Sequence, residues 1–168
     1  MEADQVGWLQ DLDPLDHYLV HAFRNAAVAL GHGCEEHRDA ARTDLARITR
    51  ALDRTGTLRR FWSLMTTLGT QARRQVRFHV PDCPCLGADE AAFLQLCAHL
   101  RRGERVAATG IANGLVQGEA VARLMRHAAV IVNRLREPAP QWPPSSPAQS
   151  GPSPRARTQP TQAGQRLH

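Results

Sequence analysis

The hydrophobic pattern of the chain is helical over most of its length. Apolar residues recur at intervals of three and four between residues 14 and 136, as they do on the buried face of an amphipathic helix. Four stripes predict helices over residues 14–30, 35–53, 57–76 and 89–102. The clearest stripe predicts a last helix over residues 119–136 and consists of Val121, Leu124, Met125, Ala128, Ile131, Val132 and Leu135. No segment carries a convincing strand pattern.

Residues near the predicted helix ends support these boundaries. Asp13 precedes Pro14, which is typical of a helix start, because aspartate caps free N–H groups and proline fits the first helical position. Thr57 is expected to cap the third helix and Gly87 the fourth, whose first turn is acidic. Gly103 is expected to end that fourth helix.

The segment over residues 104–117 leaves two interpretations open. Gly110, Gly114 and Gly118 are spaced by four, so in a helix they would form one smooth stripe. Each glycine inside a helix is less favourable than alanine by about 0.5–1 kcal/mol. In the first interpretation, another backbone or a ligand lies close against the stripe. In the second, the segment is a short irregular helix with loop ends.

The predicted fold class is all-α, with five or six helices bundled over residues 1–137 and a disordered tail over residues 138–168. The tail is rich in proline, serine, glutamine and arginine, and buries too little apolar surface to offset an ordering entropy of about 1–2 kcal/mol per residue. Trp142 lies among its prolines and is a candidate anchor for a partner's groove. The alternative is an inert solubilising extension.

Charge is distributed unevenly along the chain. All 21 basic residues are arginine, a bias typical of a GC-rich genome, so the net charge of +5 alone says little about nucleic acid. Residues 1–53 carry ten acids and five arginines, whereas residues 54–77 carry six arginines and no acid. The candidate phosphate contacts in that basic segment are Arg59, Arg60, Arg73, Arg74 and Arg77. The alternative is a solvated face that the acidic first third neutralises.

The sequence also predicts where the protein is found. Its acidic start has no apolar core and does not read as a secretory signal, and no apolar run approaches the roughly 18 residues of a membrane span. Four cysteines without an export signal favour a reducing compartment. We therefore expect a cytoplasmic protein with no membrane partner.

The stretch RFHVPDCPCLGADE, residues 77–90, is the strongest candidate for chemistry. It places three metal-ligating side chains within seven residues: His79, Cys83 and Cys85. Imidazole and thiolate are the ligands that zinc prefers, so the turn predicts a site for one zinc or iron ion, with a fourth ligand from Cys34, Cys97 or His99. Two alternatives stay open: a redox pair, because a helix N-terminus lowers the pKa of a nearby thiol, and a stiff turn with buried cysteines.

A second candidate metal pair lies in the first predicted helix. His17 and His21 are four residues apart, so a helix places both imidazoles on one face. Asp13 and Asp16 are close enough in sequence to act as further ligands or to orient the imidazoles. The alternative is a helix face that carries two histidines without a metal.

The sequence lacks the glycine-rich phosphate loops and the serine elbow that mark common enzyme classes. We therefore predict a small non-enzymatic binding or regulatory protein of the adaptor kind, with a protein partner and a structural metal at the His/Cys turn. One alternative is a nucleic-acid-binding regulator that uses the Arg59–Arg77 face. Another is a metal- or redox-sensing protein.

Overall fold

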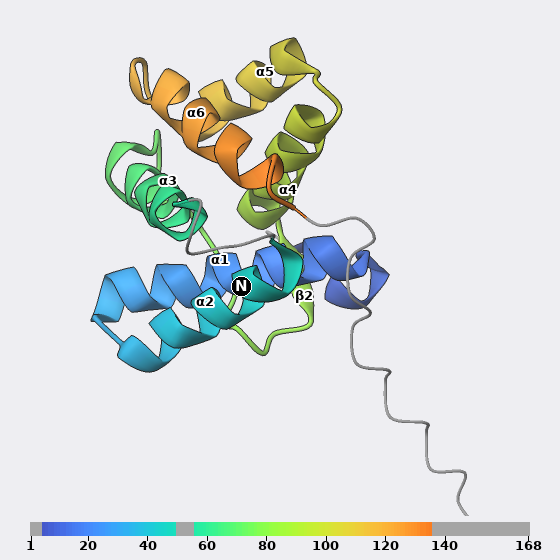
Figure 1. Cartoon of the computed structure of the whole chain (residues 1–168), viewed down its shortest axis with the longest axis vertical. Helices are drawn as coiled ribbons and strands as arrows, with labels where there is room; N and C mark the ends of the chain where they lie inside the picture. The colour runs from blue at the N-terminus through green and yellow to red at the C-terminus, as the bar shows by residue number, and fades with distance from the viewer. Residues whose placement is uncertain (1–4, 50–55, 136–168) are drawn as a thin grey trace, which may run out of the picture.

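The computed structural model describes residues 5–49 and 56–135, which form six helices and one small sheet (Figure 1). In chain order the elements are β1 (Gln5–Trp8), η1 (Leu9–Asp11), α1 (Pro14–His32), α2 (Glu35–Ile48), α3 (Thr57–Gln71), β2 (Cys85–Gly87), α4 (Ala88–Arg101), α5 (Arg105–Leu115) and α6 (Ala120–Val132). This mostly helical architecture confirms the predicted fold class. The predicted tail over residues 138–168, Trp142 included, lies outside the described residues.

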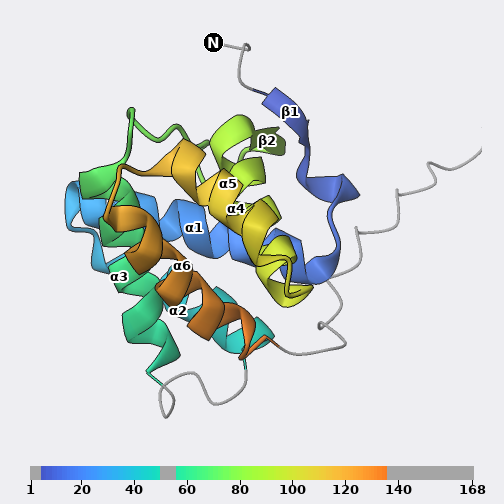
Figure 2. The ribbon, with the colours of Figure 1, turned by 90° about the horizontal axis from the view of Figure 1, so that it is seen from above.

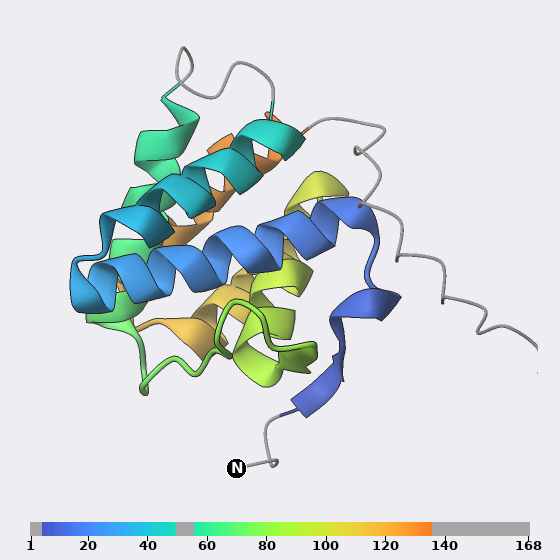
Figure 3. The same ribbon diagram turned by 90° about the horizontal axis from the view of Figure 1, so that it is seen from below.

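Helix α1 occupies the centre of the fold. Helix α2 packs along one side of α1, helices α3 and α4 pack against it from the other side, and α5 and α6 lie beyond α3 and α4 (Figures 1 and 3). The buried side chains of α1 therefore lie on several sides of the helix instead of in one stripe. One of them, Phe23, contacts the Phe93 ring of α4 at a centroid distance of 5.1 Å. Within the described ranges, no helix has both the length and the apolar character needed to cross a membrane.

The ends of α1 follow the predicted capping pattern. The backbone N–H of Asp16 donates to Asp13 Oδ1 at 2.9 Å, and Gly33 ends the helix with a φ of 66°. The predicted cap of α3 is wrong by one residue. Gly56 holds the N-cap position with a φ of 67°, and Thr57 is the buried first residue of the helix.

Helix α3 is shorter than its apolar stripe predicts. The prediction extended it to Val76, but it ends at Gln71 because the following backbone pairs with the end of α5. Arg73 N–H donates to the Leu115 carbonyl at 3.1 Å, and Gln117 N–H donates to the Gln71 carbonyl at 3.0 Å. These bonds replace the next helical turn, so residues 72–78 continue without helical structure.

The prediction that the chain has no strands is also wrong. Strands β1 and β2 form an antiparallel pair, with Trp8 opposite Cys85 and Gly7 opposite Leu86 (Figure 2). Four and three residues are too few to show a reliable alternation, which is why the pattern does not reveal them. This pairing attaches the N-terminal segment to the predicted His/Cys turn.

The structure decides between the two interpretations of the glycine stripe in residues 104–117. The segment forms a regular helix, α5, and both Gly110 and Gly114 face open space, with no atom within 4 Å of an added Cβ. No other backbone of the described chain approaches them, so the close-approach interpretation is wrong within the protein itself. Gly118 lies beyond the helix with a φ of 39°.

Replacing Gly110 or Gly114 by alanine is expected to stabilise the protein. Each change removes backbone freedom from the unfolded chain without a clash, so the free energy of unfolding should rise by about 0.5–1 kcal/mol per site. Urea denaturation measures it. Gly103→Ala is the matched control and should lower stability, because Gly103 has a φ of 75°. A gain at Gly103 or a loss at both helical sites would contradict this account.

Candidate metal centre

The His/Cys turn is built around a buried ion pair between α1 and α4. The guanidinium of Arg24 meets the carboxylate of Glu90 in a bidentate pair, with Nε to Oε1 at 2.8 Å and Nη2 to Oε2 at 2.9 Å. Both side chains have no exposed surface. Two charges removed from water in this way require complete hydrogen bonding to be tolerated.

The backbone of the turn supplies the remaining partners of Arg24. Its guanidinium donates to the carbonyls of Cys83 at 2.6 Å and Val80 at 3.3 Å, and it also donates to the Cys85 carbonyl. Within the turn, Cys83 N–H donates to the Val80 carbonyl at 3.0 Å, and Pro81 occupies the second position of this β-turn, which suits its fixed φ. One arginine therefore fixes the path of the whole turn.

Glu90 organises the other side of the turn. Its carboxylate accepts the N–H groups of His79 at 2.9 Å and Gly87 at 2.8 Å. Burial alone would raise the pKa of Glu90, but the hydrogen bonds and charge of Arg24, together with the two N–H groups, hold that pKa below its usual range. The ring atom Nδ1 of His79 lies 3.4 Å from Glu90 Oε2, so the carboxylate orients the imidazole.

Three predicted ligands converge on one point. Ligand atoms of His79, Cys83 and Cys85 all lie within 4.8 Å of one another, and the three side chains are half-buried. The two cysteines are separated only by Pro84, which precedes β2, and their side chains hydrogen-bond to each other. Two sulfurs on a tetrahedral zinc lie about 3.8 Å apart, given Zn–S bonds of about 2.3 Å. A small contraction of the cluster would therefore admit the ion.

The two thiols interact with each other. A hydrogen bond with Cys83 raises the pKa of Cys85, with burial as the next cause. This direction is opposite to the one expected from the nearby helix N-terminus, so the structure does not support an activated thiolate in the absence of a metal. A metal ion would replace the shared proton as the group that holds the sulfurs together.

The predicted fourth ligands do not join the cluster. Cys34 is the half-buried N-cap residue of α2, and Cys97 lies in the core, where burial raises the pKa of its thiol to about 12. His99 is occupied at the end of α4, with Nδ1 2.6 Å from Glu104 Oε2. Among the residues that the structure describes, the cluster thus contains three ligands and leaves one tetrahedral position to solvent or a partner.

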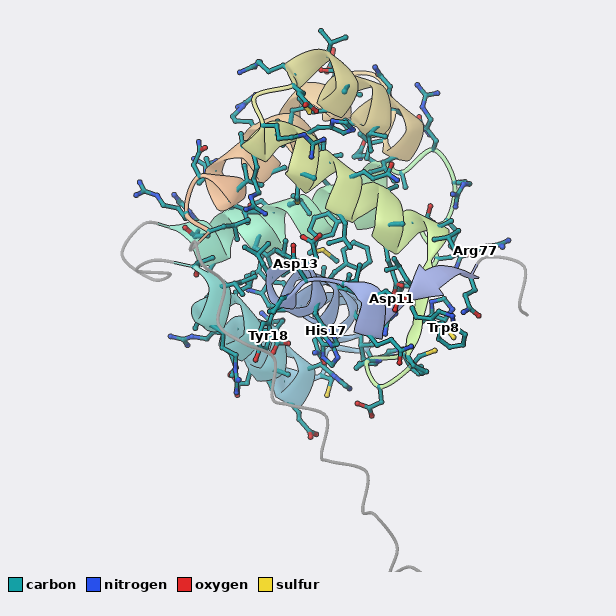
Figure 4. All side chains as sticks on the ribbon, turned by 90° about the vertical axis from the view of Figure 1, so that its right-hand side faces the viewer. Trp8, Asp11, Asp13, His17, Tyr18 and Arg77 are labelled. Atoms are coloured by element: carbon teal, nitrogen blue, oxygen red, sulfur yellow. The ribbon has the colours of Figure 1, made fainter. Side chains whose placement is uncertain are left out.

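The histidine pair of α1 lies beside the turn but does not merge with it. The rings of His17 and His21 stack at a centroid distance of 5.3 Å, and Figure 4 shows His17 next to Tyr18 on α1. Burial lowers the pKa of both histidines, while the charge of Asp82 in the turn acts on His21 in the opposite direction. In the described part of the chain, no third ligand reaches this pair.

The predicted arginine face is divided between two places. Arg59 and Arg60 lie in the first turn of α3, whereas the other three arginines follow the end of that helix. Arg73 Nε donates to the Asn113 carbonyl at 2.5 Å, and Arg74 pairs with the Asp89 carboxylate at 2.8 Å. The last member is Arg77, which lies at the edge of the molecule near β1 and Trp8 (Figure 4). These five residues do not form one face.

Sequence reasoning missed Arg24 and the role of Glu90. The signal was present in α1, where Val20 and Ala27 place apolar side chains on the same side as Arg24. A helix that is apolar on all sides is a central helix, and a single arginine in it requires a buried partner.

Comparisons with known proteins found no match for this chain. No family model, no curated protein and no solved structure matches this chain. The class that the fold and the site define is therefore a small helical protein with a cluster of three potential metal ligands.

Breaking the central pair is expected to be strongly destabilising. Arg24→Met leaves the Glu90 carboxylate and several carbonyls without their donor, so the free energy of unfolding should fall by about 3–5 kcal/mol. Arg74→Gln, which breaks a pair whose arginine is 62% exposed, should cost at most about 1 kcal/mol. Chemical denaturation of both variants measures the difference. Equal effects would show that the buried pair is not the main support of the turn.

Proposed function

We propose that the chain is a non-enzymatic binding or regulatory protein that holds one zinc ion at His79, Cys83 and Cys85. The single observation that carries this proposal is the convergence of one imidazole and two thiols within 4.8 Å. Nitrogen and sulfur ligands favour zinc over magnesium or calcium, and an iron–sulfur cluster would normally require four cysteines.

The environment of the cluster supports metal binding in three further ways. Arg24 fixes the backbone on which both thiols lie, so little ordering is required when the ion binds. Glu90 is placed to orient His79, as carboxylates commonly do for metal-bound histidine. All four cysteines are free, which suits the reducing cytoplasm predicted from the sequence.

The number of ligands bears on the role of the ion. Purely structural zinc sites are usually closed by four protein ligands, whereas a site with three leaves a position open for exchange. The half-buried cluster here has such a position. A regulatory role, in which the ion accepts a ligand from a protein partner or responds to metal supply, therefore fits the site better than a purely structural role.

The first prediction of this proposal is a bound metal. Tag-free protein purified without chelator is expected to contain about one zinc ion per chain by elemental mass spectrometry. Cys83→Ser/Cys85→Ser is expected to contain none, because two of three ligands are lost. Cys34→Ser is the matched control and should keep the metal, since Cys34 lies outside the cluster.

Two results would contradict the proposal. One is a metal-free wild type in which the thiols of Cys83 and Cys85 are both reactive, which would leave the turn as a packed structural element. The other is equal metal loss in Cys34→Ser, which would place the ion elsewhere. Thermal unfolding adds an independent check, because a chelator should lower the Tm of the wild type and leave that of the double variant unchanged.

The second prediction concerns the position of the imidazole. An added Cβ on Gly87 would lie 3.1 Å from two ring atoms of His79 and 3.3 Å from Glu90 Oε2. Gly87→Ala should therefore displace the ring and weaken Co²⁺ binding by about 10-fold or more, as loss of an orienting contact commonly does. The charge-transfer band of thiolate-bound cobalt measures this affinity.

Gly69→Ala is the control for that measurement. Gly69 has no atom within 4 Å of an added Cβ and lies in α3, away from the turn, so its variant should bind cobalt as the wild type does. Unchanged affinity in Gly87→Ala, with circular dichroism showing an intact fold, would mean that His79 is not a ligand.

A further inference from the structure

The six described helices differ in the charge of their first turns. Helices α1, α2 and α4 begin with acids, which the positive end of a helix dipole favours: Asp16, Glu35, Glu36, Asp89 and Glu90. Helices α3, α5 and α6 have no acid in the first turn and carry arginine there instead: Arg59, Arg60, Arg105 and Arg123. Glutamate holds the N-cap position of α5 and α6, whereas glycine holds that of α3. Cations at a helix N-terminus are unfavourable, so the stability of these helices does not account for the arginines.

Arginines of α3 and α6 come together in space. Helices α3 and α6 pack side by side (Figures 1 and 2). Burial lowers the pKa of His127 on α6, and the next causes are the charges of Arg60 on α3 and of Arg126 and Arg123 on α6. Arg123 and Arg126 are three residues apart and therefore share a helix face. We call the group of Arg60, Arg123 and Arg126 the α3–α6 arginine surface.

No carboxylate of the described chain forms an ion pair with this surface. The printed sequence of α3 and α6 contains no acid, and the acid nearest to α6 is Glu119 at its N-cap, which makes no ion pair with any residue in the described ranges. By contrast, Arg24, Arg38, Arg74 and Arg102 all have carboxylate partners. Three guanidinium groups thus gather where no carboxylate of the described residues pairs with them.

We propose that the α3–α6 arginine surface binds the phosphate backbone of double-stranded nucleic acid. Guanidinium forks bind phosphate oxygens bidentately, and a surface without carboxylates does not repel the phosphates. This surface differs from the Arg59–Arg77 face expected from the sequence, because it includes α6 and excludes the arginines that follow α3. It is also separate from the proposed zinc ligands.

Two features of the surface favour a duplex over other polyanions. A lipid surface would require apolar side chains beside the arginines, but the exposed large apolar residues of the described chain lie on other elements: Val6, Trp8, Leu30, Phe78, Val80 and Val106. A single strand would require exposed aromatic rings for stacking, but Phe61 is buried and Trp62 lies under the guanidinium of Arg38 at 5.2 Å.

The test uses the full chain and a fluorescently labelled DNA duplex of random sequence, with binding measured by anisotropy between about 50 and 200 mM salt. Arg123→Gln/Arg126→Gln is expected to weaken binding by about 10-fold or more at low salt. It should also reduce the slope of log K against log salt by about 2, one for each lost phosphate contact. The control variant Arg38→Gln/Arg102→Gln removes the same charge from α2 and from the end of α4, and should bind within about 2-fold of the wild type.

Each other outcome overturns the proposal. Equal losses in the two double variants would mean that only net charge matters. Absence of duplex binding at low salt would remove the activity altogether. Tighter binding of the wild type to polyglutamate or to vesicles containing phosphatidylserine than to the duplex would assign the surface to an acidic protein or to a membrane. The zinc content of Arg123→Gln/Arg126→Gln should equal that of the wild type, so failure here is distinguishable from failure of the metal proposal.

Discussion

The buried pair of Arg24 and Glu90 is the interaction on which the rest of the structure depends. It joins the central helix to α4, and it supplies the hydrogen bonds that fix the backbone between His79 and Gly87. A hydrophobic pair in the same place would hold the two helices together as well, because buried ion pairs add little net stability over apolar contacts. What an apolar pair lacks is donors and acceptors for the turn. The ion pair is therefore best understood as the device that gives this turn one conformation.

That single conformation explains why a C-x-C spacing is compatible with a metal site. The usual zinc knuckle places two residues between its cysteines, so that a tight turn brings the thiols together. Here the carbonyls of Cys83 and Cys85 both accept from Arg24, which fixes the backbone of both residues, and the two thiols lie within 4.8 Å of each other. Pairing of Cys85 with Trp8 of β1 fixes the second cysteine from the other side. The ligands are thus positioned by hydrogen bonds to the backbone, which a motif search does not detect.

The helices were predictable because their apolar faces repeat over many residues, and the cluster of His79, Cys83 and Cys85 was predictable because its members are close in sequence. Features that depend on contacts between distant parts of the chain could not be predicted. Arg24 and Glu90 are 66 residues apart. The apolar residues beside Arg24 indicate that it needs a buried partner, but nothing in the sequence identifies Glu90 as that partner. The premature end of α3 has the same origin, since the bond from Arg73 to Leu115 depends on where α5 packs. A periodic pattern describes how one element buries its face, but it does not identify the partner of a buried charge.

The first turns of the helices differ in charge, and the difference separates the helices that hold the His/Cys turn from α3 and α6. Acids begin the helices that form and support the turn, where Asp89 and Glu90 accept backbone N–H groups as well as arginine. On α3 and α6 the first turns carry arginine without acid, so these arginines are placed unfavourably relative to the helix dipoles. A chain under selection for stability alone would exchange these residues at little structural expense, since Arg59 and Arg123 are exposed. No carboxylate of the described residues pairs with these arginines, so an anionic ligand outside the chain is the partner that we propose for those of the α3–α6 arginine surface.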